Sequence, residues 1–219
     1  DVLATLQAAA PWQKLRANPQ DRLAIRPSDL RVRRYRERSE RMLLFVVDAS
    51  GSAAMARLAE AKGAAEAILS EAYRSRDHVS LITFRGDQAD CALEATRSLV
   101  RAKRLLGGLP GGGATPLADA LRKCAEQAAQ ARRRGLTPHV ILMTDGRANK
   151  ALDGSVDKAQ ARADALKMAR LLAGSGVHVL VVDSGLRPNS DLDEIAQTLK
   201  ARTVRLPRGQ RNQVSAELL

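Results

Sequence analysis

The chain alternates between short apolar runs and longer stretches in which apolar side chains recur every three or four residues. The apolar runs are rich in Val, Ile and Leu, and they cover residues 42–47, 79–84, 140–144 and 177–182. Nearly continuous runs of this length are typical of strands that are buried on both faces of a parallel sheet. The pattern therefore predicts four buried strands.

Longer stretches rich in Ala and Leu lie between these runs, at residues 54–73, 116–134 and 158–173. Their spacing predicts helices that each bury one face. Strands that alternate with helices predict an α/β fold, with a doubly wound, mostly parallel central sheet that is Rossmann-like and flanked by helices. Pro116 is expected at the first position of its helix, because its fixed φ suits a helix start.

The two ends of the chain differ from this pattern. Residues 1–40 are punctuated by prolines and contain no long periodic segment, so we expect an extended arm with an edge strand over 30–35. The arm is followed by one α/β domain over residues 41–206, whose last elements are a short helix at 189–199 and a strand at 201–206. A tail over 207–219 has room for one further helix.

Polar side chains follow the apolar runs at three places. Asp48, Ser50 and Ser52 come directly after the first run, Asp145 follows the third, and Thr115 stands just before a predicted helix. In a doubly wound sheet, ligands bind beyond the carboxyl ends of the strands where the strand order reverses, so we expect these loops to meet. Carboxylate and hydroxyl oxygens suit Mg²⁺, and Mn²⁺ accepts the same ligands. The sequence predicts a metal site with a coordination position left open.

The first of these segments has a simpler explanation when it is taken alone. Asp-x-Ser-x-Ser is common as a turn followed by a helix cap, and Ser52 is a good cap for the helix that follows. The metal interpretation depends on the combination with Thr115 and Asp145. The segment 147–157, which follows Asp145, is polar and is predicted to be a loop near the same site.

The three segments together, Asp-x-Ser-x-Ser, Gly-Gly-x-Thr-Pro-Leu and Thr-Asp-Gly, resemble the von Willebrand factor A domain, also called the integrin I domain. The resemblance covers residues 41–206. It implies a metal-ion-dependent adhesion site (MIDAS), formed by Asp48, Ser50, Ser52, Thr115 and Asp145. In such a site, the open metal position accepts an acidic residue of a partner.

A narrower resemblance is to the family of magnesium chelatase D subunits, in their C-terminal part. It is based on residues 8–13, 25–31, 45–52, 83–87 and 110–117, of which the first two segments lie outside the generic A domain. This resemblance implies a non-hydrolysing partner of an AAA+ ATPase subunit and of a porphyrin-binding subunit. The complex inserts Mg²⁺ into protoporphyrin IX in (bacterio)chlorophyll synthesis, driven by ATP. It implies the bacterial cytoplasm, or the chloroplast stroma in a plant or alga.

The charge is positive and unevenly distributed. The formal net charge is +12, and residues 1–41 hold ten Lys and Arg against five Asp and Glu. We weigh a merely solvated surface against an acidic protein partner that contacts Arg31, Arg33, Arg34 and Arg36. Nucleic acid is not expected, because no recognition motif is present and the few aromatic residues are not interleaved with the basic runs.

Other features narrow the class of protein. No stretch approaches the ~20 apolar residues of a membrane span. Cys91 and Cys124 are isolated in the sequence, which favours unpaired thiols in a reducing compartment. The tripeptide Arg85-Gly86-Asp87 resembles an integrin ligand, but we predict a turn in which Gly86 has positive φ. The chain begins with Asp1 and without a leader, so we expect it to be part of a longer protein.

The loops contain no nucleophile–base pair, and no Lys-Ser/Thr follows residues 111–113 to make a phosphate loop. We therefore expect a binding module and not a catalyst. Two alternatives stay open: an A domain of another AAA+ system, such as cobalt chelatase or a MoxR-type maturation factor, and a Mg²⁺-dependent phosphatase that uses Asp48. Against the phosphatase, Ser50 stands where the common Asp-x-Asp pattern has its second carboxylate.

Overall fold

The computed structural model describes residues 1–16, 23–33, 40–50, 69, 72, 74–109, 111–185 and 187–205. The chain divides into two compact units, Asp1–Arg38 and Ser39–Leu219. Nearly all of the helix predicted over 54–73 and the whole of the tail over 207–219 lie outside the described residues. None of the described helices combines the length and the apolar character that crossing a bilayer requires.

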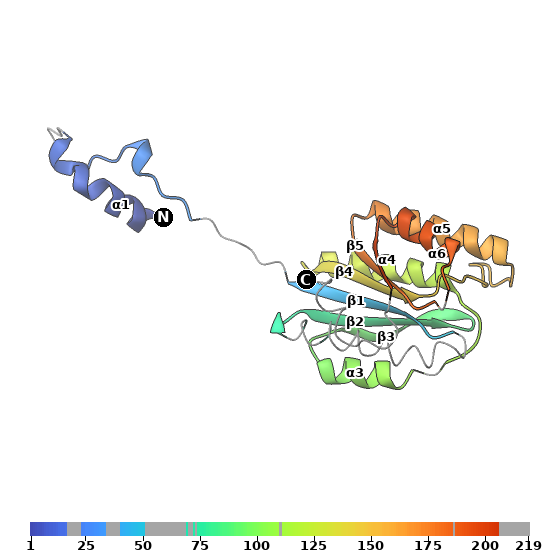
Figure 1. The fold of residues 1–219 in the computed structure, drawn as a ribbon. Helices are drawn as coiled ribbons and strands as arrows, with labels where there is room; N and C mark the ends of the chain where they lie inside the picture. The colour runs from blue at the N-terminus through green and yellow to red at the C-terminus, as the bar shows by residue number, and fades with distance from the viewer. Residues whose placement is uncertain are drawn as a thin grey trace. The chain divides into compact units, whose positions relative to one another are not determined.

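A six-stranded sheet forms the centre of the second unit, in the order β3-β2-β1-β4-β5-β6 (Figure 1). The strands are Arg41–Asp48 (β1), His78–Arg85 (β2), Gln88–Thr96 (β3), Thr137–Thr144 (β4), His178–Asp183 (β5) and Arg202–Arg205 (β6). Neighbouring strands pair in parallel, except that β2 and β3 are antiparallel. The predicted α/β fold with a mostly parallel sheet is therefore confirmed.

Helices cover both faces of this sheet, as Figure 1 shows. Helices α4 (Leu117–Arg133), α5 (Lys158–Gly174) and α6 (Ser190–Thr198) lie on one face, and α3 (Leu99–Gly107) lies on the other. Alternate residues of β1 enter the two cores: Leu44 packs in the cluster that includes α4, whereas Phe45 packs in the cluster that includes α3. Both side chains are fully buried, which explains why β1 is a continuous apolar run.

Two elements of the second unit were not predicted from the sequence. β3 is a partly exposed edge strand rich in polar residues, and α3 is only nine residues long, so neither produces a strong apolar pattern. The turn between β2 and β3 contains Gly86 at φ 62°, as predicted. Pro116 differs from the prediction, because it is the residue that caps α4 and not the first residue inside it.

The first unit is more ordered than an extended arm. It contains helix α1 (Val2–Ala9) and the 3-10 turns η1 (Ala10–Leu15) and η2 (Pro27–Asp29). The edge strand predicted over 30–35 is wrong for residues 30–33, the part of it that the structure describes. Their backbone turns to the helix instead, since the Arg31 N–H donates to Thr5 Oγ1 at 3.0 Å.

The side chain of Gln13 links the two halves of this unit. Its amide nitrogen donates to the carbonyl oxygens of Ala9 at 2.8 Å and Ala24 at 3.0 Å, and its amide oxygen accepts from the Ala24 N–H at 2.9 Å. Residue 24 lies outside any helix or strand, and Gln13 provides hydrogen-bond partners for both its N–H and its carbonyl oxygen. The Gln13 side chain therefore connects two backbone segments of this unit that are not joined by a sheet.

Candidate metal centre

The strand order reverses between β1 and β4, because β1 pairs with β2 on one side and with β4 on the other. The two strands are in parallel register, with Val47 opposite Met143, so both end at the same edge of the sheet. Asp48 is the last residue of β1, and Asp145 follows the last residue of β4. This edge is where open α/β sheets bind ligands.

Asp48 is held by hydrogen bonds to both of its carboxylate oxygens. The N–H and the hydroxyl of Ser50 donate to Asp48 Oδ1 at 2.9 and 2.6 Å. The hydroxyl of Thr144 donates to Asp48 Oδ2 at 2.9 Å, and the Thr144 oxygen accepts from the Gly146 N–H at 3.1 Å. The carboxylate is thus fixed by its own loop and by the end of the neighbouring strand.

Thr115 brings a second loop to the same place. Its Oγ1 lies 2.6 Å from Ser50 Oγ, although 65 positions separate the two residues in the chain. Because the single Ser50 proton is directed to Asp48, Thr115 acts as the donor in this pair. Asn149 holds Thr115 in place: Asn149 Oδ1 accepts from the Thr115 N–H at 2.6 Å, and the Asn149 N–H donates to the Thr115 carbonyl at 3.3 Å.

Asp145 lies at the same edge but has different partners. Its carboxylate accepts from the Arg147 N–H at 3.0 Å and lies 3.5 Å from the Arg147 guanidinium. The Asn189 side chain donates to its backbone carbonyl at 2.8 Å. No hydrogen bond joins the Asp145 side chain to Asp48, Ser50 or Thr115 among the residues that the structure describes.

The charge of Asp48 is poorly compensated in its surroundings. Burial raises the pKa of Asp48 to about 6, although the hydrogen bonds from Ser50 and Thr144 act to lower it; the negative charge of Asp145 adds to the rise. A buried carboxylate whose pKa is raised further by a second carboxylate nearby favours a cation.

The chemistry of the donor set fits a magnesium ion. In the described part of the chain, no group of three or more His, Cys, Asp and Glu side chains is placed to hold a metal. A metal at this edge therefore has to use hydroxyl oxygens as well as carboxylates. Asp48, Ser50 and Thr115 present such oxygens within hydrogen-bond distance of one another, and Mg²⁺ prefers hard oxygen ligands and water.

Three residues of the predicted sites are not described by the structure, and two residues that support the metal centre were not predicted from the sequence. Ser52, Arg34 and Arg36 lie outside the described residues. Sequence reasoning missed Thr144 and Asn149, which position the side chain of Asp48 and the backbone of Thr115. The sequence did contain a signal for Thr144, because this residue is polar and ends an apolar run. The structure shows that its side chain is fully buried.

The two described arginines of the predicted partner surface have internal contacts. The Arg33 guanidinium donates to the Asp1 carboxylate at 2.8 Å, while two thirds of its side-chain surface is exposed, 67%. The Arg31 guanidinium donates to the carbonyl oxygens of Ser28 and Leu30 at 2.9 and 3.2 Å. Among the residues that the structure describes, no carboxylate lies within ion-pair distance of Arg31.

Comparison with known families agrees with the fold described above. Residues 43–147 match the model of the von Willebrand factor type A domain. The matched range begins at the third residue of β1 and ends three residues after β4. This part of the chain is a von Willebrand factor A domain. Residues 2–35 match a second model, the AAPxQ domain, which falls in the first unit.

The relatives of this von Willebrand A chain include subunits of one enzyme. The magnesium-chelatase 60 kDa subunit of Cereibacter sphaeroides is 55% identical over 218 residues, which are 98% of this chain and 39% of the relative. The 60 kDa subunit of Rhodobacter capsulatus is 50% identical over 213 residues, 95% of this chain and 38% of the relative. The chain therefore spans well under half the length of these relatives.

Solved structures show the same fold at low identity. A von Willebrand factor type A protein from Catenulispora acidiphila matches with a TM-score of 0.61 at 18% identity, over 82% of this chain and 41% of that one. The SpRpn10 VWA domain matches with a TM-score of 0.59 at 12% identity, over 82% of this chain and 94% of that one.

Proposed function

We propose that this chain is a metal-dependent protein-interaction module of a D-type magnesium-chelatase subunit. The carrying observation is the cluster of Asp48, Ser50 and Thr115 oxygens at the strand-order reversal, around a carboxylate whose charge is poorly compensated. The relatives that bear the magnesium-chelatase name supply the identity of the complex. In it, the module would assemble with an AAA+ ATPase subunit and a porphyrin-binding subunit for ATP-driven Mg²⁺ insertion into protoporphyrin IX, in (bacterio)chlorophyll synthesis.

Some of these residues would bind the ion, and others would hold the ligands in position. Asp48, Ser50 and Thr115 would supply oxygen ligands, with Ser52 as a further hydroxyl, and Asp145 would contribute charge directly or through water. Thr144 and Asn149 would keep the ligands in place, since each donates to or accepts from a ligand residue. A bound Mg²⁺ would supply an open coordination position that accepts a carboxylate of a partner.

This assignment makes the module an assembly element. In this role the chain would take no part in ATP chemistry, because the ion would bind a carboxylate of a partner. Residues 111–113 are also not followed by the Lys-Ser/Thr of a phosphate loop. Loss of the site should therefore uncouple ATP hydrolysis by the AAA+ ATPase subunit from metal insertion. Such a complex works in a soluble compartment, the bacterial cytoplasm or, in a plant or alga, the chloroplast stroma.

The test uses the complete subunit in a reconstituted complex and measures two rates on each sample. For Asp145→Ala we expect Mg-porphyrin formation to fall at least roughly tenfold, as for loss of a charged interaction, while ATP hydrolysis continues. Glu126→Ala is the matched control, because it removes an exposed carboxylate on α4. It should leave both rates unchanged.

Two results would contradict this proposal. Full insertion activity of the Asp145→Ala complex would mean that the site is not used. Loss of both rates, with subunits that still associate in gel filtration, would mean that the site acts on ATP chemistry and not on assembly. Calorimetric titration of the isolated chain with Mg²⁺ provides a readout that does not depend on activity.

A further inference from the structure

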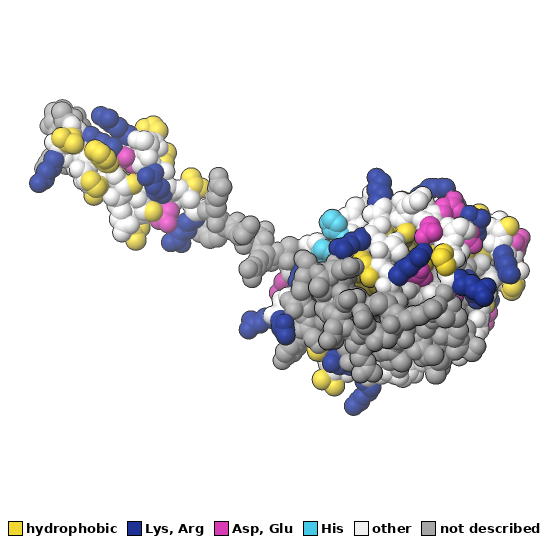
Figure 2. Space-filling view, in the orientation of Figure 1, with side chains coloured by type: hydrophobic (Ala, Val, Ile, Leu, Met, Phe, Trp, Pro, Cys, Tyr) yellow, Lys and Arg dark blue, Asp and Glu magenta, His cyan; other side chains and the backbone are white. Residues whose placement is uncertain are grey.

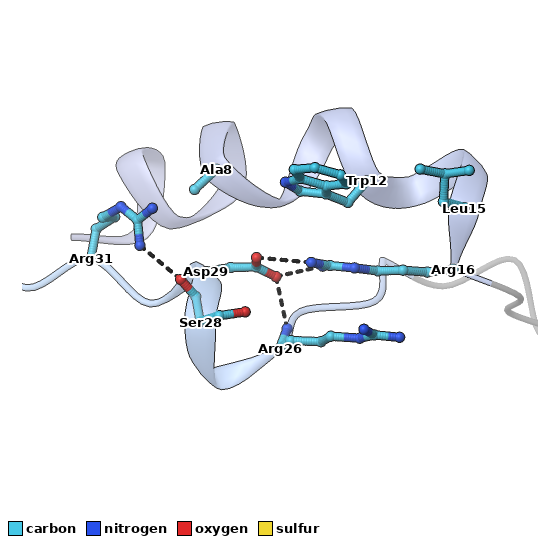
Figure 3. A pocket seen from close by; sticks show the side chains of 8 residues that line it. All are labelled: Ala8, Trp12, Leu15, Arg16, Arg26, Ser28, Asp29 and Arg31. Carbon is cyan, nitrogen blue, oxygen red and sulfur yellow. Dashed lines mark hydrogen bonds and ion pairs between the residues drawn. The ribbon is translucent and has the colours of Figure 1, made fainter.

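The first unit contains a pocket that is separate from the metal centre. It has a volume of about 370 Å³ and lies between the α1–η1 segment and the η2 turn (Figure 3). Eight residues line it: Ala8, Trp12, Leu15, Arg16, Arg26, Ser28, Asp29 and Arg31. The pocket is therefore formed by apolar side chains from the helical segment and by charged side chains that include three arginines.

A buried ion pair forms the centre of this pocket. The Arg16 guanidinium binds both oxygens of Asp29, and the Arg26 N–H donates to Asp29 Oδ2 at 2.8 Å. The two side chains are only 9% and 5% exposed. These bonds lower the pKa of Asp29 to about 2, so Asp29 stays ionised and its charge is matched by Arg16. The bidentate pair gives the pocket a fixed wall.

The other two arginines leave the pocket positively charged. The Arg26 side chain forms no ion pair with any residue that the structure describes, and the Arg31 guanidinium donates only to the neutral carbonyls of Ser28 and Leu30. In Figure 3 the guanidinium groups of Arg26 and Arg31 lie on opposite sides of the Asp29 carboxylate. A ligand here meets positive charge at both ends.

Between the arginines, the pocket presents exposed apolar surface. The Trp12 side chain is 52% exposed and faces the ion pair, with Leu15 beside it (Figure 3). Apolar side chains lie at several places on the surface of this unit (Figure 2). Of the thirteen exposed large hydrophobic residues in the described part of the chain, nine belong to it: Val2, Leu3, Leu6, Trp12, Leu15, Leu23, Ile25, Leu30 and Val32. Two of these nine, Trp12 and Leu15, line the pocket, so exposed apolar surface lies next to its charged groups.

We propose that this pocket binds an acidic segment of a partner protein. A carboxylate of that segment pairs with Arg26, and a neighbouring apolar side chain packs against Trp12 and Leu15. Arginine and tryptophan are the residues that most often dominate binding energy at interfaces. A small anion satisfies only the charged half of the pocket, whereas a peptide also covers the apolar half. This binding needs no metal, so it goes beyond the function proposed above and is tested without it.

Trp12 also occupies an informative position in the AAPxQ segment. Residues 9–13 of this chain read Ala-Ala-Pro-Trp-Gln, so Trp12 fills the position that the name of the domain leaves unspecified. The specified Gln13 has a structural role, since it joins residues 9 and 24. We therefore assign to Trp12 the role of selecting the apolar side chain of the ligand.

The chain provides its own reporter for this pocket, because Trp12 is its single tryptophan. The experiment titrates the 219-residue chain with a short capped peptide in which glutamates flank a leucine, in the presence of a metal chelator. We expect the Trp12 emission to shift to shorter wavelength as the peptide excludes water. The same peptide with glutamine in place of glutamate should bind at least roughly tenfold more weakly, since a charge-assisted bond is lost.

Two charge variants locate the binding. Arg26→Gln should weaken peptide binding roughly tenfold while the backbone N–H bond to Asp29 remains. Lys14→Gln is the matched control, because Lys14 is an exposed cation of the same unit that does not line the pocket. Leu15→Ala should also weaken binding, with its Trp12 emission in the absence of peptide showing that the unit is folded.

Four results would overturn the proposal. They are no response at millimolar peptide, equal binding of the glutamine peptide, equal effects of Arg26→Gln and Lys14→Gln, and saturation by inorganic phosphate alone. A response to a single-stranded oligonucleotide but not to the peptide would assign the pocket to nucleic acid instead. None of these results depends on the metal centre, so they leave its assignment untouched.

Discussion

Single residues of the metal centre have properties that their neighbours determine. Asp48 has a raised pKa because it is buried next to Asp145, and its geometry is fixed by Ser50 and Thr144. Burial of an acid without a compensating cation costs free energy, and the protein retains this cost at the strand edge. We infer that this cost is related to ligand binding, because strongly perturbed pKa values cluster at functional sites.

The first prediction concerns this residue. Asp48→Ala should remove Mg²⁺ binding, because it takes away a charge as well as an oxygen. Ser50→Ala and Thr115→Ala should each weaken binding by roughly tenfold, the value of one neutral interaction. The fold should survive in all three variants, because the residues lie at the edge of the sheet. Calorimetric titration with Mg²⁺ or Mn²⁺ measures the affinities, and circular dichroism checks the fold.

If the Asp48→Ala variant bound Mg²⁺ as tightly as the unchanged chain, this result would contradict the assignment of the metal site. Equal losses in all three variants would instead show that the hydroxyls matter as much as the charge, in conflict with the ligand roles given above.

At the scale of elements, the segment after β4 depends on one close contact. Gly146 has φ 79°, and a Cβ placed on it would lie 2.4 Å from the Cβ of Leu192 on α6. The backbone of the metal-site loop therefore packs directly against a helix. This contact, together with the bond from Asn189 to the Asp145 carbonyl, fixes the position of Asp145.

The second prediction follows from that contact. Gly146→Ala should lower the free energy of unfolding by about 3 kcal/mol, because it combines an unfavourable positive φ with overpacking against Leu192. Gly154→Ala is the matched control: Gly154 has φ 87°, but a Cβ there would meet no atom within 4 Å. It should cost about 1 kcal/mol, the conformational part alone. Urea unfolding in metal-free buffer, followed by circular dichroism, measures both; equal costs would contradict the close packing.

At the scale of the whole molecule, the two compact units are stabilised in different ways. The second unit has two apolar cores, one on each face of its sheet. The first has few buried apolar side chains among its described residues, and it relies on the Gln13 bonds and the Arg16–Asp29 pair. The two units should therefore respond differently to acid.

The third prediction is an acid transition of the first unit. The pKa of Asp29 is about 2 in the folded unit, below its ordinary value of 3.8, because Arg16 and the Arg26 N–H stabilise the carboxylate. A lowered pKa means that the stabilisation is complete above pH 3.8 and is lost as the pH falls towards 2. Emission of Trp12 should report this loss. Asp29→Asn should abolish this pH dependence, and a transition that persists in that variant would contradict the assignment.

Much of the fold and the core of the site could be predicted from the sequence. The continuous apolar runs identified the four central strands, because a strand buried on both faces has no place for polar residues. The same logic placed Asp48 and Asp145 at strand ends and Ser50 just beyond the first of them, whereas Thr115 was placed just before a helix. The local sequence is informative at these positions because a polar residue directly after an apolar run indicates where a buried strand ends.

Only the tertiary structure decided how these segments meet. The 2.6 Å contact between Ser50 and Thr115 depends on the crossover connections that bring two distant loops to one edge. The support of Asp48 by Thr144 depends on the register of β4 beside β1. Such contacts have no local signature, since each side chain is ordinary in its own segment.

The arm shows the limit of sequence reasoning most clearly. Its prolines and its lack of periodicity predicted an extended arm, yet the structure contains a helix and a pocket around Arg16 and Asp29. That unit is held by polar bonds between residues that are distant in the sequence, 11 positions apart for Gln13 and Ala24 and 26 for Thr5 and Arg31, which hydrophobic periodicity cannot detect. Sequence alone determined where apolar surface must be buried; the tertiary structure decided which polar groups satisfy one another, because hydrogen bonding depends on position and direction in space.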